Sequence, residues 1–145
     1  MVHALDHSCY MLTMVDDATC WLHVAILQHK SDAFAKFIAW QTFLKMQYNL
    51  LIKCVQSDND TMFLSCDFKL FLESNGMQQQ LTVHDTPQQN GTVERIHGTV
   101  FNAMCANLIT LGLLRNLWAE CLNYVTYVYN RVPHATLKYE MLFHS

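Results

Sequence analysis

Two acidic residues occupy positions that suit metal chemistry. Asp58 follows an apolar stretch that is typical of a buried strand, and Glu94 lies in the first turn of a long amphipathic helix predicted from Thr92 onward. Exactly 35 residues separate them. A carboxylate at a strand end and another on a neighbouring helix can converge on one spot, and Mg²⁺ prefers such oxygen ligands. Two ions about 4 Å apart would activate a hydroxyl and stabilise the leaving oxygen in phosphoryl transfer.

Spacing alone leaves a plainer interpretation open. The chain has 12 Asp and Glu residues, so many pairs fall at arbitrary distances. An exposed Asp58 and a Glu94 favoured by the positive end of a helix dipole would give the same pattern.

The elements that would position these acids follow a mixed α/β order. A helix is expected to start after Ser31 as its N-cap, and 84–91 is expected to be a loop. The order predicts one domain over 1–145, with helices covering a single sheet. Strands are predicted at 10–15, 20–27, 50–55 and 77–83, the last a polar edge strand that contains Gln78, Gln79 and Gln80. Helices are predicted from Asp32 onward, at 65–74 with Asn75-Gly76 as the C-cap, from Thr92 onward with an apolar stripe from Val93 to Leu111, and at 116–131.

Composition excludes several classes. The 145 residues are 52% hydrophobic and 14% charged, which is too apolar for a disordered tail. No apolar run reaches the roughly 18 residues that would span a membrane, and the first residues do not resemble a secretory signal. The net charge of -3 argues mildly against strong nucleic-acid affinity. The six Cys lack metal-site spacing and are expected to be small buried side chains in a reducing compartment.

The residues around both acids carry a motif. Residues 86–95 (TPQQNGTVER) resemble the T-P-Q-Q-N-G-x-x-E-R signature of copia-type retrotransposon integrases, and 57–59 (SDN) resemble the start of their S-D-N-G-G-E-Y segment. The 35-residue gap matches the D-35-E spacing of that family. Four further stretches resemble family segments in the same order along the chain. They are 10–19 with the hairpin strand that runs into the D-D-x-[ST]-R turn, 29–34 with K-S-[ED]-A-F, 117–120 with F-W-A-E-A, and 130–133 with N-R-x-P.

The resemblance implies a ribonuclease-H-like fold whose carboxylates bind two Mg²⁺ or Mn²⁺ ions for DNA integration. Asp58 and Glu94 take the roles of the second and third acids, both catalytic and metal-binding. The matching motif also implies DNA contacts from Gln88, Gln89 and Asn90. Arg95 would bind a phosphate or form a surface salt bridge. The implied partners are element-end and target DNA and a second copy of the chain, in the nucleus or a nucleoprotein particle, with no membrane.

The first acid of the family is not found. It should end an opening strand, yet Asp6 lies only four residues before the hairpin, so we interpret it as a turn residue and expect the first strand to be missing through truncation. Asp16 and Asp17 match a family pair that lies in the hairpin turn, where structural capping is expected.

Other departures lie beside the site. Residues 60–63 (DTMF) replace G-G-E-Y, which removes backbone freedom, and 96–99 (IHGT) replace K-N-R-T, which removes cations that would contact phosphate. His97 is an alternative metal ligand. The sequence therefore predicts an integrase-core-like transposable-element domain with impaired strand transfer, and whether it is an enzyme stays open. The alternatives are a non-catalytic nucleic-acid- or protein-interaction remnant and a relic that folds poorly.

Overall fold

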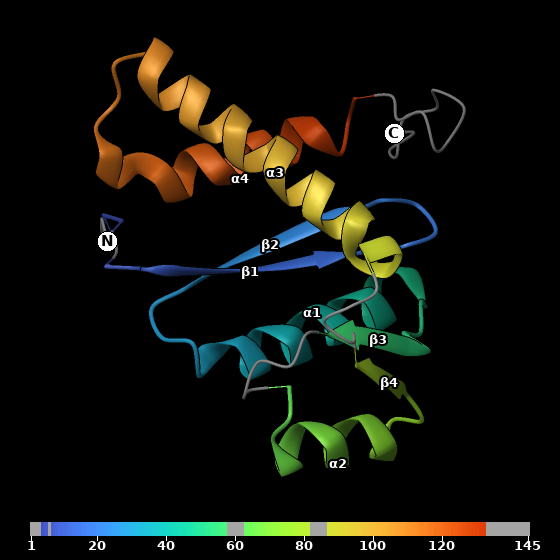
Figure 1. The fold of residues 1–145 in the computed structure, drawn as a ribbon. Coiled ribbons are helices and arrows are strands. Elements are labelled where there is room, and N and C mark those ends of the chain that lie inside the picture. The colour runs from blue at the N-terminus through green and yellow to red at the C-terminus, as the bar shows by residue number, and fades with distance from the viewer. Residues whose placement is uncertain (1–3, 6, 58–62, 82–86, 133–145) are drawn as a thin grey trace. The chain divides into compact units, whose positions relative to one another are not determined.

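The computed structural model describes residues 4–5, 7–57, 63–81 and 87–132, with side chains from residue 91 in the last range (Figure 1). Its mixed α/β content confirms the predicted fold class. The elements, in chain order, are β1 (Tyr10–Val15), β2 (Leu22–Leu27), α1 (Asp32–Tyr48), β3 (Cys54–Ser57), α2 (Cys66–Ser74), β4 (Gln78–Leu81), α3 (Pro87–Thr110), the 3₁₀ helix η1 (Arg115–Leu117) and α4 (Trp118–Tyr129).

The chain divides into two compact units. One combines the residues up to His29 with those from Thr92 onward, and the other is Lys30–Gly91. The first contains the antiparallel hairpin β1–β2, and the second contains the parallel pair β3–β4. The expectation of a single sheet is therefore wrong for the described residues, whose strands pair within each unit.

The hairpin forms as predicted, and its turn is held by an acid. The Oδ2 atom of Asp16 accepts hydrogen bonds from the backbone N–H of Thr19, at 3.1 Å, and from the Thr19 hydroxyl. This is the capping role expected of Asp16. Cys20 then adopts a left-handed conformation with φ of 59°, so β2 begins at Leu22 and not at Cys20.

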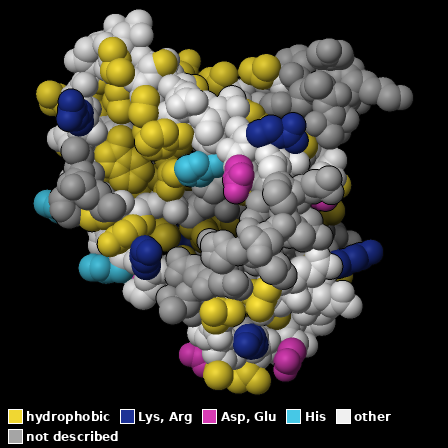
Figure 2. All heavy atoms as spheres, viewed as in Figure 1, with side chains coloured by type: hydrophobic (Ala, Val, Ile, Leu, Met, Phe, Trp, Pro, Cys, Tyr) yellow, Lys and Arg dark blue, Asp and Glu magenta, His cyan; other side chains and the backbone are white. Residues whose placement is uncertain are grey.

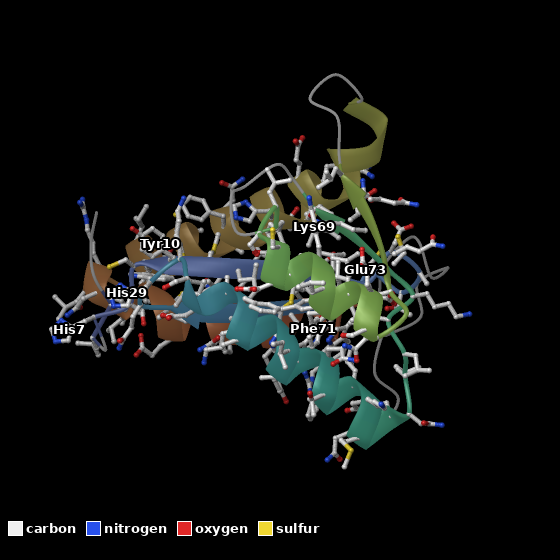
Figure 3. All side chains as sticks on the ribbon, turned by 90° about the horizontal axis from the view of Figure 1, so that it is seen from below. His7, Tyr10, His29, Lys69, Phe71 and Glu73 are labelled. Atoms are coloured by element: carbon white, nitrogen blue, oxygen red, sulfur yellow. The ribbon has the colours of Figure 1, made fainter. Side chains whose placement is uncertain are left out.

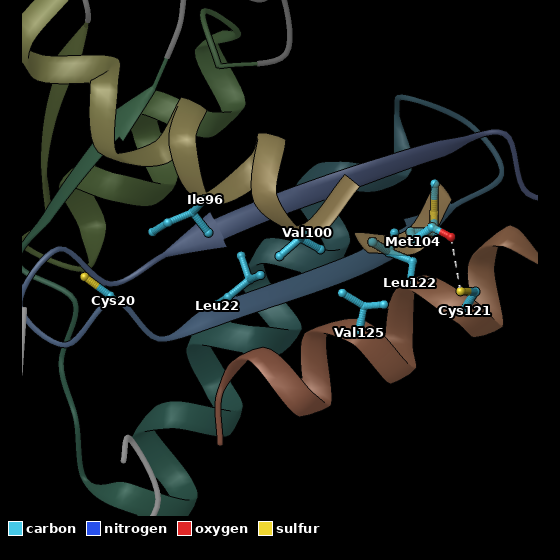
Figure 4. Packing of buried hydrophobic residues seen from close by; sticks show 8 residues of the cluster. All are labelled: Cys20, Leu22, Ile96, Val100, Met104, Cys121, Leu122 and Val125. Carbon is cyan, nitrogen blue, oxygen red and sulfur yellow. Dashed lines mark hydrogen bonds between the residues drawn. The ribbon is translucent and has the colours of Figure 1, made fainter. Parts of the chain in front are cut away.

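Helices α3 and α4 and the hairpin share one buried cluster (Figure 4). In α3 the buried residues Ile96, Val100 and Met104 follow each other at intervals of four, which places them on one helix face. Leu122 and Val125 of α4 complete the contact with the hairpin. The predicted apolar stripe is thus confirmed at its centre, while its two ends, Val93 and Leu111, are exposed.

Asn130 connects the end of α4 to the start of β2. Its Nδ2 donates to the backbone oxygen of Leu22 at 2.7 Å, and its Oδ1 accepts from the backbone N–H of Leu22 at 2.9 Å. Both residues are buried. The amide therefore satisfies two buried backbone groups that water cannot reach.

The second unit is built around phenylalanine rings from α1 and α2. Phe71 lies between these helices (Figure 3), with its ring centroid 5.6 Å from that of Phe34. Phe68 is fully buried and also contacts the ring of Phe37. These aromatic residues recur at helical spacing in the sequence, and the side chains pack together in the core of this unit.

Two glycines end helices as left-handed caps. Gly76, predicted as a C-cap, has φ of 68°, and the N–H of the following Met77 donates to the oxygen of Leu72 at 2.8 Å. Gly112 has φ of 60°, and Leu113 donates to Leu108 in the same way at 2.9 Å. Both are Schellman motifs, which satisfy carbonyls at the helix end.

The N-terminal caps differ between helices. Ser65 accepts a hydrogen bond from the N–H of Phe68 and caps α2. Ser31 directly precedes α1 as predicted, but it has helical dihedral angles and its side chain forms no cap bond.

The predicted positions of β3 and of the start of α3 are also wrong. The strand expected at 50–55 lies at Cys54–Ser57, because pairing with β4 decides the strand and the apolar Leu50 and Leu51 are exposed. The loop expected at 84–91 is helical from Pro87 onward. Proline suits the first turn of a helix, where its missing N–H has no partner to lose.

Candidate functional site

The segment that carries Asp58 begins where β3 ends. Ser57, the last residue of the strand, is 7% exposed, and its backbone aligns with Leu81 in the parallel register. Asp58 follows the strand, but the prediction of a buried strand is wrong, because Cys54 and Gln56 are exposed. The side chain of Asp58 lies outside the described residues. Its pairing with Glu94 remains a prediction.

Gln79 contacts the chain on both sides of this segment. Its Nε2 donates to the backbone oxygen of Phe63 at 2.7 Å and to the hydroxyl oxygen of Ser57 at 3.3 Å. Sequence reasoning treated Gln79 only as one of three polar residues of an edge strand. The sequence did hold a signal for this contact. In a strand, successive side chains point to opposite faces, so Gln79 had to face away from Gln78 and Gln80.

Glu94 lies on α3 with an exposed side chain. Because the helix begins at Pro87, Glu94 lies about two turns inside it and not in the first turn, where the helix dipole would favour it. No residue in the described ranges forms a hydrogen bond or ion pair with the Glu94 carboxylate.

The residues expected to contact DNA lie on the same helix. Arg95 is exposed, and its Nη2 donates to Thr92 Oγ1 at 3.3 Å. Gln88, Gln89 and Asn90 belong to the first turns of α3 by their backbone, and their side chains lie outside the described part. Helical backbone at these positions replaces the expected loop.

His97 is exposed beside Phe101, with ring centroids 6.2 Å apart and planes within 8° of parallel. Histidines also lie near the open end of the hairpin, where His7 and His29 flank the Tyr10–Leu27 pair (Figure 3). Within residues 4–5, 7–57, 63–81 and 87–132, no three His, Cys, Asp or Glu side chains are grouped so as to hold a metal ion. Asp6 and Asp58 lie outside that range.

The cysteines are free thiols in three environments. Cys20 and Cys121 are buried as expected, whereas Cys54 and Cys66 are exposed, so the expectation of six buried side chains is wrong. Burial raises the pKa of the Cys121 thiol, and the nearby Cys105 raises it further. The Cys121 Sγ donates to the backbone oxygen of Met104 at 3.6 Å (Figure 4).

Retroviral integrase cores are among the solved structures that resemble this chain. The HTLV-2 integrase catalytic core domain in complex with magnesium matches 83% of this chain and 73% of that chain, with a TM-score of 0.64 and 20% identity. A simian T-cell lymphotropic virus intasome in complex with the PP2A regulatory subunit B56 gamma gives a TM-score of 0.66 at 14% identity, over 83% of this chain and 41% of that chain. The chain thus has the ribonuclease-H-like fold of integrase catalytic cores.

Sequence relatives are retrotransposon polyproteins. The retrovirus-related Pol polyprotein from transposon TNT 1-94 of Nicotiana tabacum is 29% identical over 140 residues, which are 97% of this chain and 10% of the polyprotein. The Transposon Ty1-DR4 Gag-Pol polyprotein of Saccharomyces cerevisiae is 24% identical over 133 residues, 89% of this chain and 8% of the polyprotein. No protein-family model matches the chain.

These homologues and the fold confirm the resemblance to the integrase core of a copia-type element. The chain therefore has an integrase-core-like fold and is similar in sequence to retrotransposon polyproteins over most of its length. It spans about a tenth of the length of the polyproteins that it matches.

Proposed function

We propose that this chain is the DNA- and metal-binding core of a retrotransposon integrase, which acts on element ends and target DNA in the nucleus or in a nucleoprotein particle. The observation that supports it most is the agreement between the integrase-core fold and the homology to Pol polyproteins over 97% of the chain.

Asp58 and Glu94 are the proposed metal ligands and catalytic carboxylates. Their oxygen atoms are the donors that Mg²⁺ and Mn²⁺ prefer, and the exposed Glu94 carboxylate has no competing partner among the described residues. Bound divalent ions would lower the pKa of the attacking hydroxyl and stabilise the leaving oxygen. The magnesium in the HTLV-2 core supports the choice of ion.

DNA contacts are assigned to Gln88, Gln89, Asn90 and Arg95. Arg95 is exposed on the same helix as Glu94, so the guanidinium can reach a phosphate near that carboxylate. With a net charge of -3 for the whole chain, binding must depend on such local contacts and should be weak.

Two proposed carboxylates are one fewer than the three that the resemblance implies. Strand transfer by the 145-residue chain alone is therefore expected to be at or near background, because a missing metal ligand removes several kcal/mol of transition-state stabilisation, about a thousandfold in rate.

A second copy of the chain is the proposed protein partner. Apolar side chains are exposed where α3 ends and the chain turns towards α4, at the upper left of Figure 2. Integrase cores of HTLV-2 occur in dimeric and trimeric forms. The exposed set comprises Ile109, Leu111, Leu113 and Leu114.

Titration with Mn²⁺, followed by electron paramagnetic resonance of the free ion, tests the metal site. Asp58→Asn and Glu94→Gln should each weaken Mn²⁺ binding at least tenfold. Glu73→Gln is the matched control, because Glu73 is an exposed carboxylate on α2 outside the proposed site, and it should bind Mn²⁺ as the unaltered chain does. Equal Mn²⁺ affinity in all four proteins would refute the site.

Assays with element-end DNA test the activity. Turnover above background that disappears in Asp58→Asn would contradict the expected impairment. DNA binding that falls steeply with salt and survives the double change Asp58→Asn, Glu94→Gln would favour the non-catalytic interaction module.

A further inference from the structure

One face of α3 carries an exposed aromatic pair beside a glycine. Glu94, Gly98 and Phe101 follow each other at intervals of four and three residues, which places them on one side of the helix. His97 lies next to them, and its ring stacks on that of Phe101, with centroids 6.2 Å apart and planes within 8° of parallel. All four residues belong to the part of α3 whose side chains the structure describes.

The aromatic pair does not belong to the core. Phe101 is 44% exposed and His97 is also exposed, whereas the buried residues of α3 lie on another face of the helix. His97 also lines a small surface crevice with Met11 and Thr13 of β1, so one side of the pair is held against the hairpin. The other side presents flat apolar surface to the solvent, and another planar ring can stack on such a surface.

Gly98 leaves the helix backbone uncovered beside this pair. Apart from the two chain neighbours and the backbone of the helix itself, no heavy atom of the described residues lies within 4 Å of the place where a Cβ atom would be. A glycine weakens a helix, but it lets another molecule approach the backbone closely. The open space above Gly98, between the side chains of Glu94 and Phe101, is therefore a Gly98 gap in the surface of α3.

The charges on α3 favour a nucleic acid as the molecule that covers this face. Arg95 is the only Lys or Arg in the sequence of α3, and its exposed guanidinium can bind a phosphate. Residues 96–99 have no cation, so a further contact on this face must come from stacking and not from ion pairing. Proteins hold unpaired bases in this way, since every base has a flat face that stacks on an aromatic side chain.

We propose that the Phe101 ring and the Gly98 gap form a binding site for one unpaired nucleobase at a DNA end. The inference rests on the proposed function, in which α3 binds DNA through Arg95. The base stacks on the Phe101 ring and fills the Gly98 gap, while the adjoining phosphate lies within reach of Arg95. Phe101 is thus a specificity-determining residue. It favours ends with an unpaired nucleotide over fully paired ends, because only a base outside the duplex stack presents its face to the ring.

The test compares a fully paired DNA duplex with one that has a short single-stranded overhang. Both contain 2-aminopurine, a fluorescent base whose emission falls when it stacks, and in the second duplex it lies in the overhang. The full chain should bind the overhang duplex about tenfold more tightly, the factor that one base stacked on an aromatic side chain supplies, and should quench its fluorescence. Phe101→Leu should lose the preference and the quenching, whereas Phe101→Tyr should keep both.

Phe43→Leu is the matched control, because Phe43 is an exposed phenylalanine on α1 that also contacts an aromatic ring. It should bind both duplexes as the unaltered chain does. Gly98→Leu keeps the test decisive if Phe101→Leu does not fold. Leucine is the better helix former and the space at this position is open, so this variant should unfold at a higher temperature. Its side chain fills the Gly98 gap and should remove the preference for the overhang.

The outcomes separate the stacking site from DNA binding as such. Equal affinity for the overhang duplex in the unaltered chain, Phe101→Leu and Gly98→Leu, while Arg95→Gln weakens binding of both duplexes, overturns the stacking site and leaves the DNA-binding function standing. A loss in Phe43→Leu as large as that in Phe101→Leu also overturns the stacking site. If the unaltered chain binds neither duplex at low salt, the proposed DNA binding and the stacking site fall together.

Discussion

Replacing Asn130 with alanine tests a long-range contact outside the apolar core, between the end of α4 and the start of β2. The change leaves the N–H and the carbonyl of Leu22 without their partners, which now lie at 2.9 and 2.7 Å. Leu22 is 1% exposed and Asn130 is 4% exposed, so water cannot take over these bonds without opening the core.

The expected loss of stability follows from this burial. Each orphaned backbone group costs about 1–3 kcal/mol, and partial relaxation brings the total for Asn130→Ala to about 3 kcal/mol. With an ordinary urea dependence of about 1–3 kcal/mol per M, the midpoint of unfolding should fall by about 1–3 M. Fluorescence reports the transition in this unit when Trp40, which belongs to the other unit, is replaced by Phe in all the compared proteins, so that Trp21 and Trp118 give the signal.

Asn123→Ala is the matched control, because Asn123 is an exposed residue of α4, the helix that Asn130 directly follows. It should leave stability unchanged or raise it by a few tenths of a kcal/mol, since alanine is the better helix former. If Asn130→Ala costs no more than about 0.5 kcal/mol relative to this control, the inference that the amide replaces two backbone partners is refuted.

Three further changes test local features. Gly112→Ala should cost about 1 kcal/mol in urea unfolding, because its φ of 60° disfavours any residue with a Cβ; no loss would contradict the left-handed cap. Ser65→Ala should also cost about 1 kcal/mol, whereas Ser31→Ala should cost almost nothing, because only Ser65 bonds to a helix N–H; equal losses would be the contrary result. Burial lowers the pKa of His23 from 6.5 in the folded chain, so the unfolded chain binds more protons below that pH. The stability that depends on neutral His23 is therefore complete above about pH 6.5 and declines as the pH falls through this value. A His23→Leu variant should lose less stability on acidification than the unaltered chain. Equal losses in the two proteins would contradict the role of His23.

Local signals in the sequence were sufficient for most elements. The hairpin turn at Asp16 and the cap at Gly76 depend on residues within a few positions of each other, and both were predicted correctly. The start of α3 was missed because Pro87 and the polar residues after it are typical of loops, although proline is also favoured in a first helical turn. The strand at Cys54–Ser57 was displaced in the prediction because its pairing with β4, and not its hydrophobicity, determines it.

The motif in the sequence was enough to propose Asp58 and Glu94 as candidate site residues. The hydrogen bonds of Gln79 and Asn130 could not be predicted from it. Asp58 and Glu94 stand out through their neighbours in the sequence, whereas the exposure of Glu94 depends on how α3 packs. The bonds of Gln79 join residues 16 and 22 positions away, and those of Asn130 join residues 108 positions apart. Such pairs arise from tertiary structure, which a single sequence does not encode in any local pattern.

The amide of Asn130 also has a consequence for synthesis on the ribosome. The hairpin leaves the ribosome early. Asn130, which bonds to the backbone of Leu22 at the start of β2, follows 108 positions later. At translation rates of about 5–20 residues per second, that delay is about 5–20 s. During this time the hairpin lacks the contacts of α4, and for most of it also those of α3, while the Lys30–Gly91 unit is already complete in sequence. Nascent chains should therefore be most prone to aggregate, or to recruit chaperones, before α4 leaves the exit tunnel.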